Sequence, residues 1–144
     1  MTDDEFIANF ESCTLPTKSF HHAEHVKTAF LYLCRYPALE ALPRFSAALA
    51  RFAAAKGKPD IYNETITWAF FFLIRERMAR AGFSQTWDEF AAGNGDLLNW
   101  QNSILKKYYR DETLSSDLAK STFLLPDKAS MSPQYSSAYL RAES

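Results

Sequence analysis

This sequence of 144 residues has little glycine, little cysteine and almost no net charge, and each shortage excludes a class of protein. The four glycines form neither a phosphate-binding loop nor a nucleophile elbow. The two cysteines, Cys13 and Cys34, lack the spacing of a metal site, so we expect reduced thiols in a cytoplasmic protein. The net charge of −1 argues against a dedicated nucleic-acid surface.

Long apolar runs and a secretory signal are also missing. The longest apolar run covers 68–74, whereas a membrane-spanning helix needs roughly 20 apolar residues. The first residues, M-T-D-D-E-F-I, are acidic where a signal peptide is basic. We therefore expect no membrane contact and a cytoplasmic location.

The residues that are present favour helices. Hydrophobic residues make up 47% of the chain and aromatic residues 15%, and they recur at helical spacing without any alternating strand pattern. A chain of this length can bury a core without disulfides. We predict an all-α fold, in which 1–126 form a single compact domain, an irregular or orthogonal bundle of five to seven helices. The serine-rich segment 127–144 is predicted to be an extended or loosely ordered tail.

Capping residues and breakers set the expected helix boundaries. The helix over 64–81, with Asn63 as its N-cap, is apolar on nearly every side in its first half, so we place it at the centre. The next capping box is formed by Thr86 and Glu89. Thr17 or Ser19 is expected to cap a helix over 20–36, and the helix that follows starts after Pro37 or at Pro43 and ends at Gly57. Further helices are expected over 2–13, 86–93, 97–109 and 113–123. In the 97–109 helix the residues expected to be buried are Leu97, Trp100, Ile104 and Leu105.

All three histidines lie within five positions at the start of the 20–36 helix. A helix turns by about 100° per residue. This projection places His22 on the apolar face, His25 at the edge of that face, and His21 towards water. His22 and His25 are three residues apart, so their rings can converge on a common point.

We predict a polar pocket between the starts of the 20–36 and 64–81 helices. Two neutral imidazoles and a carboxylate can hold a divalent metal and leave positions open for a substrate, which makes His22, His25 and Glu64 the candidate ligands. The protein would then be a small-molecule or metal-binding protein, or a small enzyme with hydrolytic or metal-assisted chemistry. The candidate ligand-binding residues are His22, His25, Tyr62, Asn63, Glu64 and Thr67.

Two alternatives remain open, and the sequence does not decide whether the protein is an enzyme. In one, the histidines perform acid–base or ligand-binding work without a metal. In the other, they are structural residues bonded to carbonyls or hydroxyls inside a non-catalytic scaffold, whose aromatic residues cover a partner surface or a homo-oligomer interface. A match of 21–25 to the zinc-protease pattern H-x-x-E-H is set aside, because His21 and Glu24 project towards water.

The two motif segments resemble a family of small uncharacterised all-helical bacterial proteins. The segments are F-H-H-A-E-H-V-K-T-A-F-L-Y-L and R-F-A-A-A-K-G-K-P-D-I-Y-N-E-T-I-T-W-A, and the family pattern is F-H-x-x-H followed by Y-H-x-T-[IL]-T. The resemblance implies no established activity. This chain departs from the pattern at Asn63, where the family has a third histidine. If that histidine is a metal ligand, this chain lacks one of the ligands. Asn63 can still donate and accept hydrogen bonds, so the alternative is a polar pocket without a metal. The matching positions are Phe20, His22, His25, Tyr62, Thr65, Ile66 and Thr67.

Overall fold

Helices are the only regular elements in residues 1–128, the part of the chain that the computed structural model describes. The prediction of an all-α fold is therefore confirmed. The α-helices are α1 (Asp3–Glu11), α2 (His22–Arg35), α3 (Ala38–Ala55), α4 (Glu64–Arg80), α5 (Trp87–Gly93), α6 (Gly95–Leu98), α7 (Asp111–Leu114) and α8 (Asp117–Ser121). Three 3₁₀-helices complete the set: η1 (Thr17–Ser19), η2 (Pro59–Ile61) and η3 (Ile104–Lys107).

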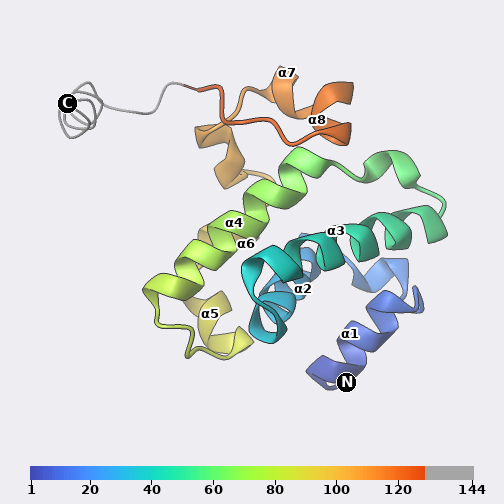
Figure 1. The fold of residues 1–144 in the computed structure, drawn as a ribbon, viewed down its shortest axis with the longest axis vertical. Helices are drawn as coiled ribbons and strands as arrows, with labels where there is room; N and C mark the ends of the chain where they lie inside the picture. The colour runs from blue at the N-terminus through green and yellow to red at the C-terminus, as the bar shows by residue number, and fades with distance from the viewer. Residues whose placement is uncertain (129–144) are drawn as a thin grey trace.

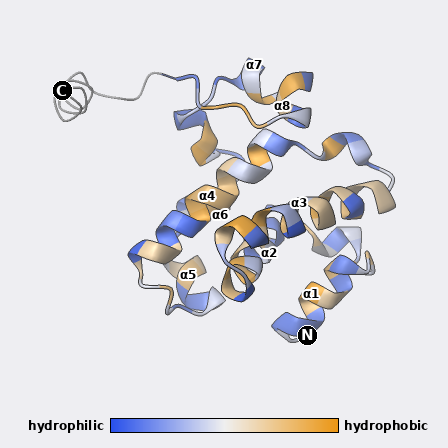
Figure 2. Cartoon of the chain, viewed as in Figure 1, coloured by the Kyte–Doolittle hydropathy of each residue, from blue (hydrophilic) through white to orange (hydrophobic). Residues whose placement is uncertain are grey.

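Helix α4 is the centre of the arrangement, as its apolar sequence predicts. It packs against α2, α3, α8 and η3, and Figure 1 shows it as the long diagonal helix with α8 near its first turn. The side chain of Asn63 accepts a hydrogen bond from the N–H of Ile66 (3.0 Å), which confirms the predicted cap. Burial is less complete than predicted, because Phe72 is 42% exposed. Figure 2 shows apolar residues giving way to hydrophilic ones towards the end of α4.

Helices α2 and α3 are separated only by Tyr36 and Pro37. α2 begins later than predicted, with His21 at the N-cap position, because 17–19 form η1 instead of capping the helix. The Glu24 carboxylate accepts the backbone N–H of His21 (3.1 Å) and so satisfies one of the free donors of the first turn. Of the two predicted starts for α3, the first is observed, because α3 begins directly after Pro37 and continues through Pro43.

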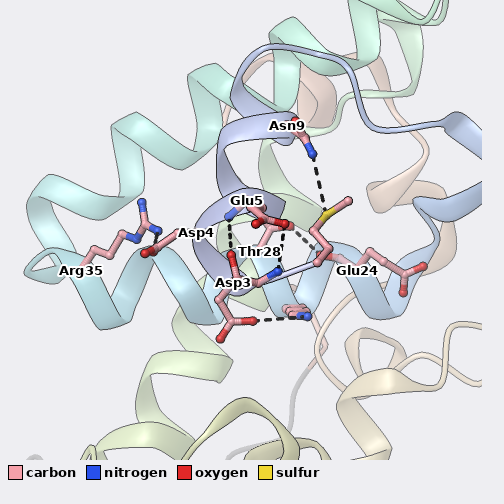
Figure 3. A network of polar contacts seen from close by, with 10 residues as sticks. Asp3, Asp4, Glu5, Asn9, Glu24, Thr28 and Arg35 are labelled. Atoms are coloured by element: carbon pink, nitrogen blue, oxygen red, sulfur yellow. Dashed lines mark hydrogen bonds and ion pairs between the residues drawn. The ribbon is translucent and has the colours of Figure 1, made fainter.

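Helix α1 packs on α2 through an apolar face and a polar edge. Phe6, Ile7 and Phe10 are buried on that face, as the helical spacing predicts. At the edge, Asp3 and Asp4 of the first turn form ion pairs with Lys27 and Arg35 of α2, and Figure 3 shows Asp4 beside Arg35. Exposed ion pairs of this kind contribute little stability, so the apolar face holds α1 in place.

The helix predicted over 97–109 is wrong beyond Leu98. The side chain of Asn99 accepts the N–H of Asn102 (3.0 Å), and this local bond replaces a helical turn. As a result Trp100, predicted to be buried, is 53% exposed. The other buried positions predicted for this segment are confirmed: Leu97, Ile104 and Leu105.

The helix predicted over 113–123 divides into α7 and α8. Ser116 lies between the two and caps α8, because its hydroxyl accepts the N–H of Ala119 (3.1 Å). This division gives eight α-helices within residues 1–128, one more than the upper limit that the sequence predicts.

The end of the described chain folds back onto the segment that precedes α7. The Asp127 carboxylate accepts the N–H of Arg110 (2.9 Å) and the hydroxyl of Thr113, and the N–H of Lys128 donates to the Tyr108 carbonyl (3.0 Å). The remainder of the predicted tail, 129–144, lies outside the described residues. None of the helices within 1–128 has the length and hydropathy of a membrane span.

Candidate ligand-binding site

The starts of α2 and α4 meet beside α3 around a cavity of about 560 Å³. Its inner end consists of Phe45, Phe71 and Ile74, which are almost completely buried. Most of the remaining wall is also apolar, so the chamber is less polar than the pocket that the sequence predicts. A volume of this size is typical of sites for small organic molecules.

The predicted site residues are brought together with one exception. Glu64 does not line the cavity, whereas the other candidate ligand-binding residues do. The prediction that the two motif segments adjoin each other is therefore confirmed for this part of the chain. The predicted residues on the wall are His22, His25, Tyr62, Asn63 and Thr67.

His22 lies on the wall and also performs a structural task. Its Nε2 lies 2.8 Å from the Leu97 carbonyl oxygen, and its ring packs against Phe70 and Trp100 with centroids 4.8 and 5.1 Å away. Burial lowers the pKa of His22, and this outweighs the opposing effects of the Leu97 carbonyl and Glu24. A carbonyl only accepts hydrogen bonds, so Nε2 carries the proton and Nδ1 is left as an acceptor.

His25 has no such partner. Its ring packs beside Phe20, with centroids 4.5 Å apart, and no hydrogen bond to either of its ring nitrogens is found within residues 1–128. Burial, and secondarily the neighbouring His22, lower the pKa of His25 from 6.5 to about 4. The imidazole is therefore neutral at pH 7, and it offers one N–H donor and one nitrogen acceptor to the cavity.

Tyr62 and Glu64 are engaged with each other at the start of α4. The Tyr62 hydroxyl donates a hydrogen bond to Oε1 of Glu64. Burial raises the pKa of Tyr62, and the Glu64 carboxylate raises it further, while the hydroxyls of Ser46 and Thr67 oppose this. Tyr62 therefore stays a neutral phenol, and Glu64 turns its carboxylate to Tyr62 rather than to the histidines.

Asn63 is fully used by the fold. Besides capping α4, its side-chain amide donates to the Leu114 carbonyl (2.8 Å) and fastens α7 to the start of α4. Its amide nitrogen and oxygen each have a backbone partner, although the residue borders the cavity. We therefore assign Asn63 a structural role within this site.

The predicted three-residue metal site is not assembled in the structure. In residues 1–128, no group of three or more His, Cys, Asp or Glu side chains is close enough to hold a metal ion. His22, His25 and Glu64 therefore do not form one ligand set, because Glu64 is paired with Tyr62. The H-x-x-E-H match has no metal geometry either, since Glu24 is occupied by the N–H of His21.

The sequence analysis missed two groups of lining residues. One is a set of aromatic side chains, which includes Phe20, Phe52 and Trp100, and the other is a set of lysines. Lys56 and Lys58 directly precede the Tyr62 motif, so their position in the sequence could have indicated them. The third, Lys120 on α8, gives no signal because only the fold brings it to the cavity.

Comparison with models of known protein families, with curated proteins and with solved structures gives no match for this chain. The resemblance to a bacterial family therefore stays a prediction, and the case for a function rests on the geometry of the cavity.

Proposed function

We propose that this protein binds a small, largely apolar molecule in the cavity between α2, α3 and α4, and that His25 hydrogen-bonds to a polar group of that molecule. The observation that carries the proposal is a neutral imidazole that has no hydrogen-bond partner among residues 1–128 and lies on the wall of an apolar cavity of about 560 Å³. The His25 side chain is part-buried and has no protein hydrogen bond within residues 1–128, so its ring nitrogens are available to a ligand. A ligand that supplies the missing bond would therefore be favoured over a purely apolar one.

The charge state of His25 favours binding over acid–base catalysis. A general base works best when its pKa lies near the working pH, and the pKa of His25 is lowered to about 4. At pH 7 its imidazole is a weak base but a good hydrogen-bonding group. We therefore propose a binding protein rather than an enzyme in which His25 acts as a general base. We also place this function in the cytoplasm, where Cys13 and Cys34, both free, would remain reduced.

The competing hypothesis is a scaffold in which every histidine is structural, and one observation favours it in part. His22 donates to the Leu97 carbonyl, as a structural histidine would. Within our proposal His22 therefore forms part of the wall, and His25 makes the polar contact with the ligand. A scaffold would leave the cavity without a ligand and His25 without any measurable role in binding.

A fluorescence titration with N-phenyl-1-naphthylamine tests the proposal, because this neutral dye is apolar and carries one N–H that can donate to His25. We expect saturable binding to the full-length protein. Ala53→Trp, at a position on the cavity wall, should abolish binding. Ala54→Trp is the matched control, because Ala54 is exposed on the same helix and does not line the cavity.

His25→Phe keeps the aromatic ring and removes both polar atoms, so it separates the hydrogen bond from the shape of the cavity. We expect dye affinity to fall about fivefold, the effect of one hydrogen bond. Absence of saturable binding, or equal binding by the Ala53→Trp and Ala54→Trp variants, would refute the proposal. Circular dichroism of each variant checks that the fold is retained.

A further inference from the structure

The charged groups at the cavity are of one sign. Lys56 at the end of α3, Lys58 in the turn before η2, and Lys120 on α8 all contribute to its lining. No aspartate or glutamate contributes to it among the described residues. The whole chain carries a net charge of −1, so these three positive charges on the lining are a local feature and do not reflect the composition.

The three lysines are not neutralised by neighbouring side chains. Within residues 1–128, none of them takes part in an ion pair, although five pairs are formed elsewhere. The ammonium group of Lys56 lies over the Phe52 ring, 5.4 Å from its centroid, and Phe52 also lines the cavity. This contact orients a positive charge along the aromatic wall instead of leaving it to move freely in water.

The positive and apolar parts of the site lie on one continuous wall. The ring of Phe52 is 4.7 Å from that of Phe20, which in turn is 4.5 Å from that of His25. The wall therefore runs from a lysine through two phenylalanine rings to the unpartnered imidazole. A ligand lying along it would meet a positive charge, then apolar surface, then a neutral hydrogen-bonding group.

From this arrangement we infer that the ligand is an amphiphilic anion with a carboxylate head at the lysines and an apolar body in the cavity. This inference rests on the proposed function, and it adds the charge of the ligand and its orientation. Lysine acts on anions as a mobile point charge, not as a planar fork, so the site selects the charge of the head more than its shape. The group that bonds to His25 is a second polar atom, further along the body.

Competition between matched ten-carbon compounds tests the inference. Decanoate, 1-decanol and decylammonium share an apolar chain and differ in the charge of the head. Each is titrated against the full-length protein with bound N-phenyl-1-naphthylamine at pH 7.5. We expect decanoate to displace the dye at a concentration about ten times lower than decanol does, and decylammonium to be the weakest competitor.

The lysines are then neutralised together in a Lys56→Gln, Lys58→Gln, Lys120→Gln variant. We expect this variant to lose the preference for decanoate over decanol, measured as the ratio of the two displacing concentrations and therefore independent of its affinity for the dye. The control variant, Arg75→Gln, Lys106→Gln, Lys107→Gln, removes the same number of positive charges from positions that do not line the cavity, and it should keep the preference.

The outcomes separate this inference from the proposed function. If the dye binds but decanol competes as well as decanoate does, the anionic head is refuted and the apolar site stands. An equal loss of preference in both lysine-to-glutamine sets would show that only the general charge of the protein matters, and it would also overturn the inference. If the dye does not bind at all, both proposals fail.

Discussion

The starts of α2 and α4 look alike in sequence, since each places polar residues directly before a very apolar helix. The structure uses them differently. At the start of α4, Asn63 holds α7 and Thr65 holds the segment around α8, so the polar side chains connect this helix to distant parts of the chain. At the start of α2, His22 has one backbone partner and His25 has none among the described residues. The first region is therefore a structural junction, and the second keeps a polar group for a ligand.

The two regions differ first in burial, because Asn63 and Thr65 are buried whereas His22 and His25 are part-buried. They differ also in whether those groups have partners. The Thr65 hydroxyl accepts the N–H of Leu124 and shares its one hydrogen between the carbonyls of Ala119 and Thr122, whereas the His25 ring has no protein hydrogen bond within residues 1–128. A polar group on a cavity wall that the protein itself leaves without a partner is a better indicator of a ligand site than a buried polar group as such.

Removing the Thr65 hydroxyl should have the largest effect on stability. Thr65→Val keeps the shape but leaves the carbonyls of Ala119 and Thr122 and the N–H of Leu124 without this partner. We expect the free energy of unfolding to fall by about 3 kcal/mol, measured by urea denaturation. Thr122→Val, at an exposed position, is the control and should change it by less than about 0.5 kcal/mol. Similar losses of stability in the two variants would show that the Thr65 hydroxyl does not hold a structural junction at the start of α4, and the contrast with the start of α2 would fail.

Acid should weaken the α2 region through His25. Its pKa is lowered from 6.5 to about 4 in the folded state, so the unfolded chain binds more protons between these values. Stability should therefore fall as the pH decreases from 6.5 to 4, by up to about 3 kcal/mol from this residue.

Urea denaturation of wild-type and His25→Phe protein at several pH values measures the contribution of His25 to the pH dependence of stability. Carboxylates contribute equally to the stability curves of the two proteins, so their effect cancels in the difference. Parallel curves for wild-type and His25→Phe protein would mean that the His25 ring is solvated, and the contrast between the two regions would disappear.

Two substitutions of Asn63 separate the stability contributed by its N-cap hydrogen bond from that contributed by its hydrogen bond to α7. Asn63→Ala removes both, and we expect a loss of about 2 kcal/mol in the free energy of unfolding. Asn63→Asp keeps an oxygen for the N–H of Ile66 but has no N–H for the Leu114 carbonyl, so it should lose about half as much. Equal losses in the two variants would show that only the bond to Leu114 matters.

Much of the fold follows from local signals in the sequence. Asn63 and Thr86 begin their helices as predicted, because a side chain that bonds to a nearby N–H needs no distant partner. The 97–109 prediction failed for the same kind of reason. Its apolar spacing suits a helix, but Asn99 bonds to the backbone of Asn102 and the chain turns there. In that segment local hydrogen bonding outweighed periodicity.

The site was predictable in position but not in chemistry. Histidines on an apolar face and a polar helix start indicated that two segments would adjoin, and they do. Which polar groups would remain free depends on carbonyls far along the chain, such as those of Leu97 and Leu114, which no local pattern reveals. The pairing of Glu64 with Tyr62 likewise follows from the conformation at the start of α4, and it removes the predicted carboxylate from the histidines.

The smallest expected effect compares the two histidines directly. His22→Phe keeps the ring contacts with Phe70 and Trp100 but leaves the Leu97 carbonyl without its donor, so we expect a loss of about 1 kcal/mol in the free energy of unfolding at pH 7. His25→Phe should cost nothing at that pH, because it breaks no hydrogen bond within residues 1–128 and keeps an aromatic ring beside Phe20. Urea denaturation of the two variants side by side measures the difference. The opposite order would mean that His25 is the structural histidine, and the polar contact with a ligand would have to be reassigned to His22, whose Nδ1 would then be the free atom on the wall.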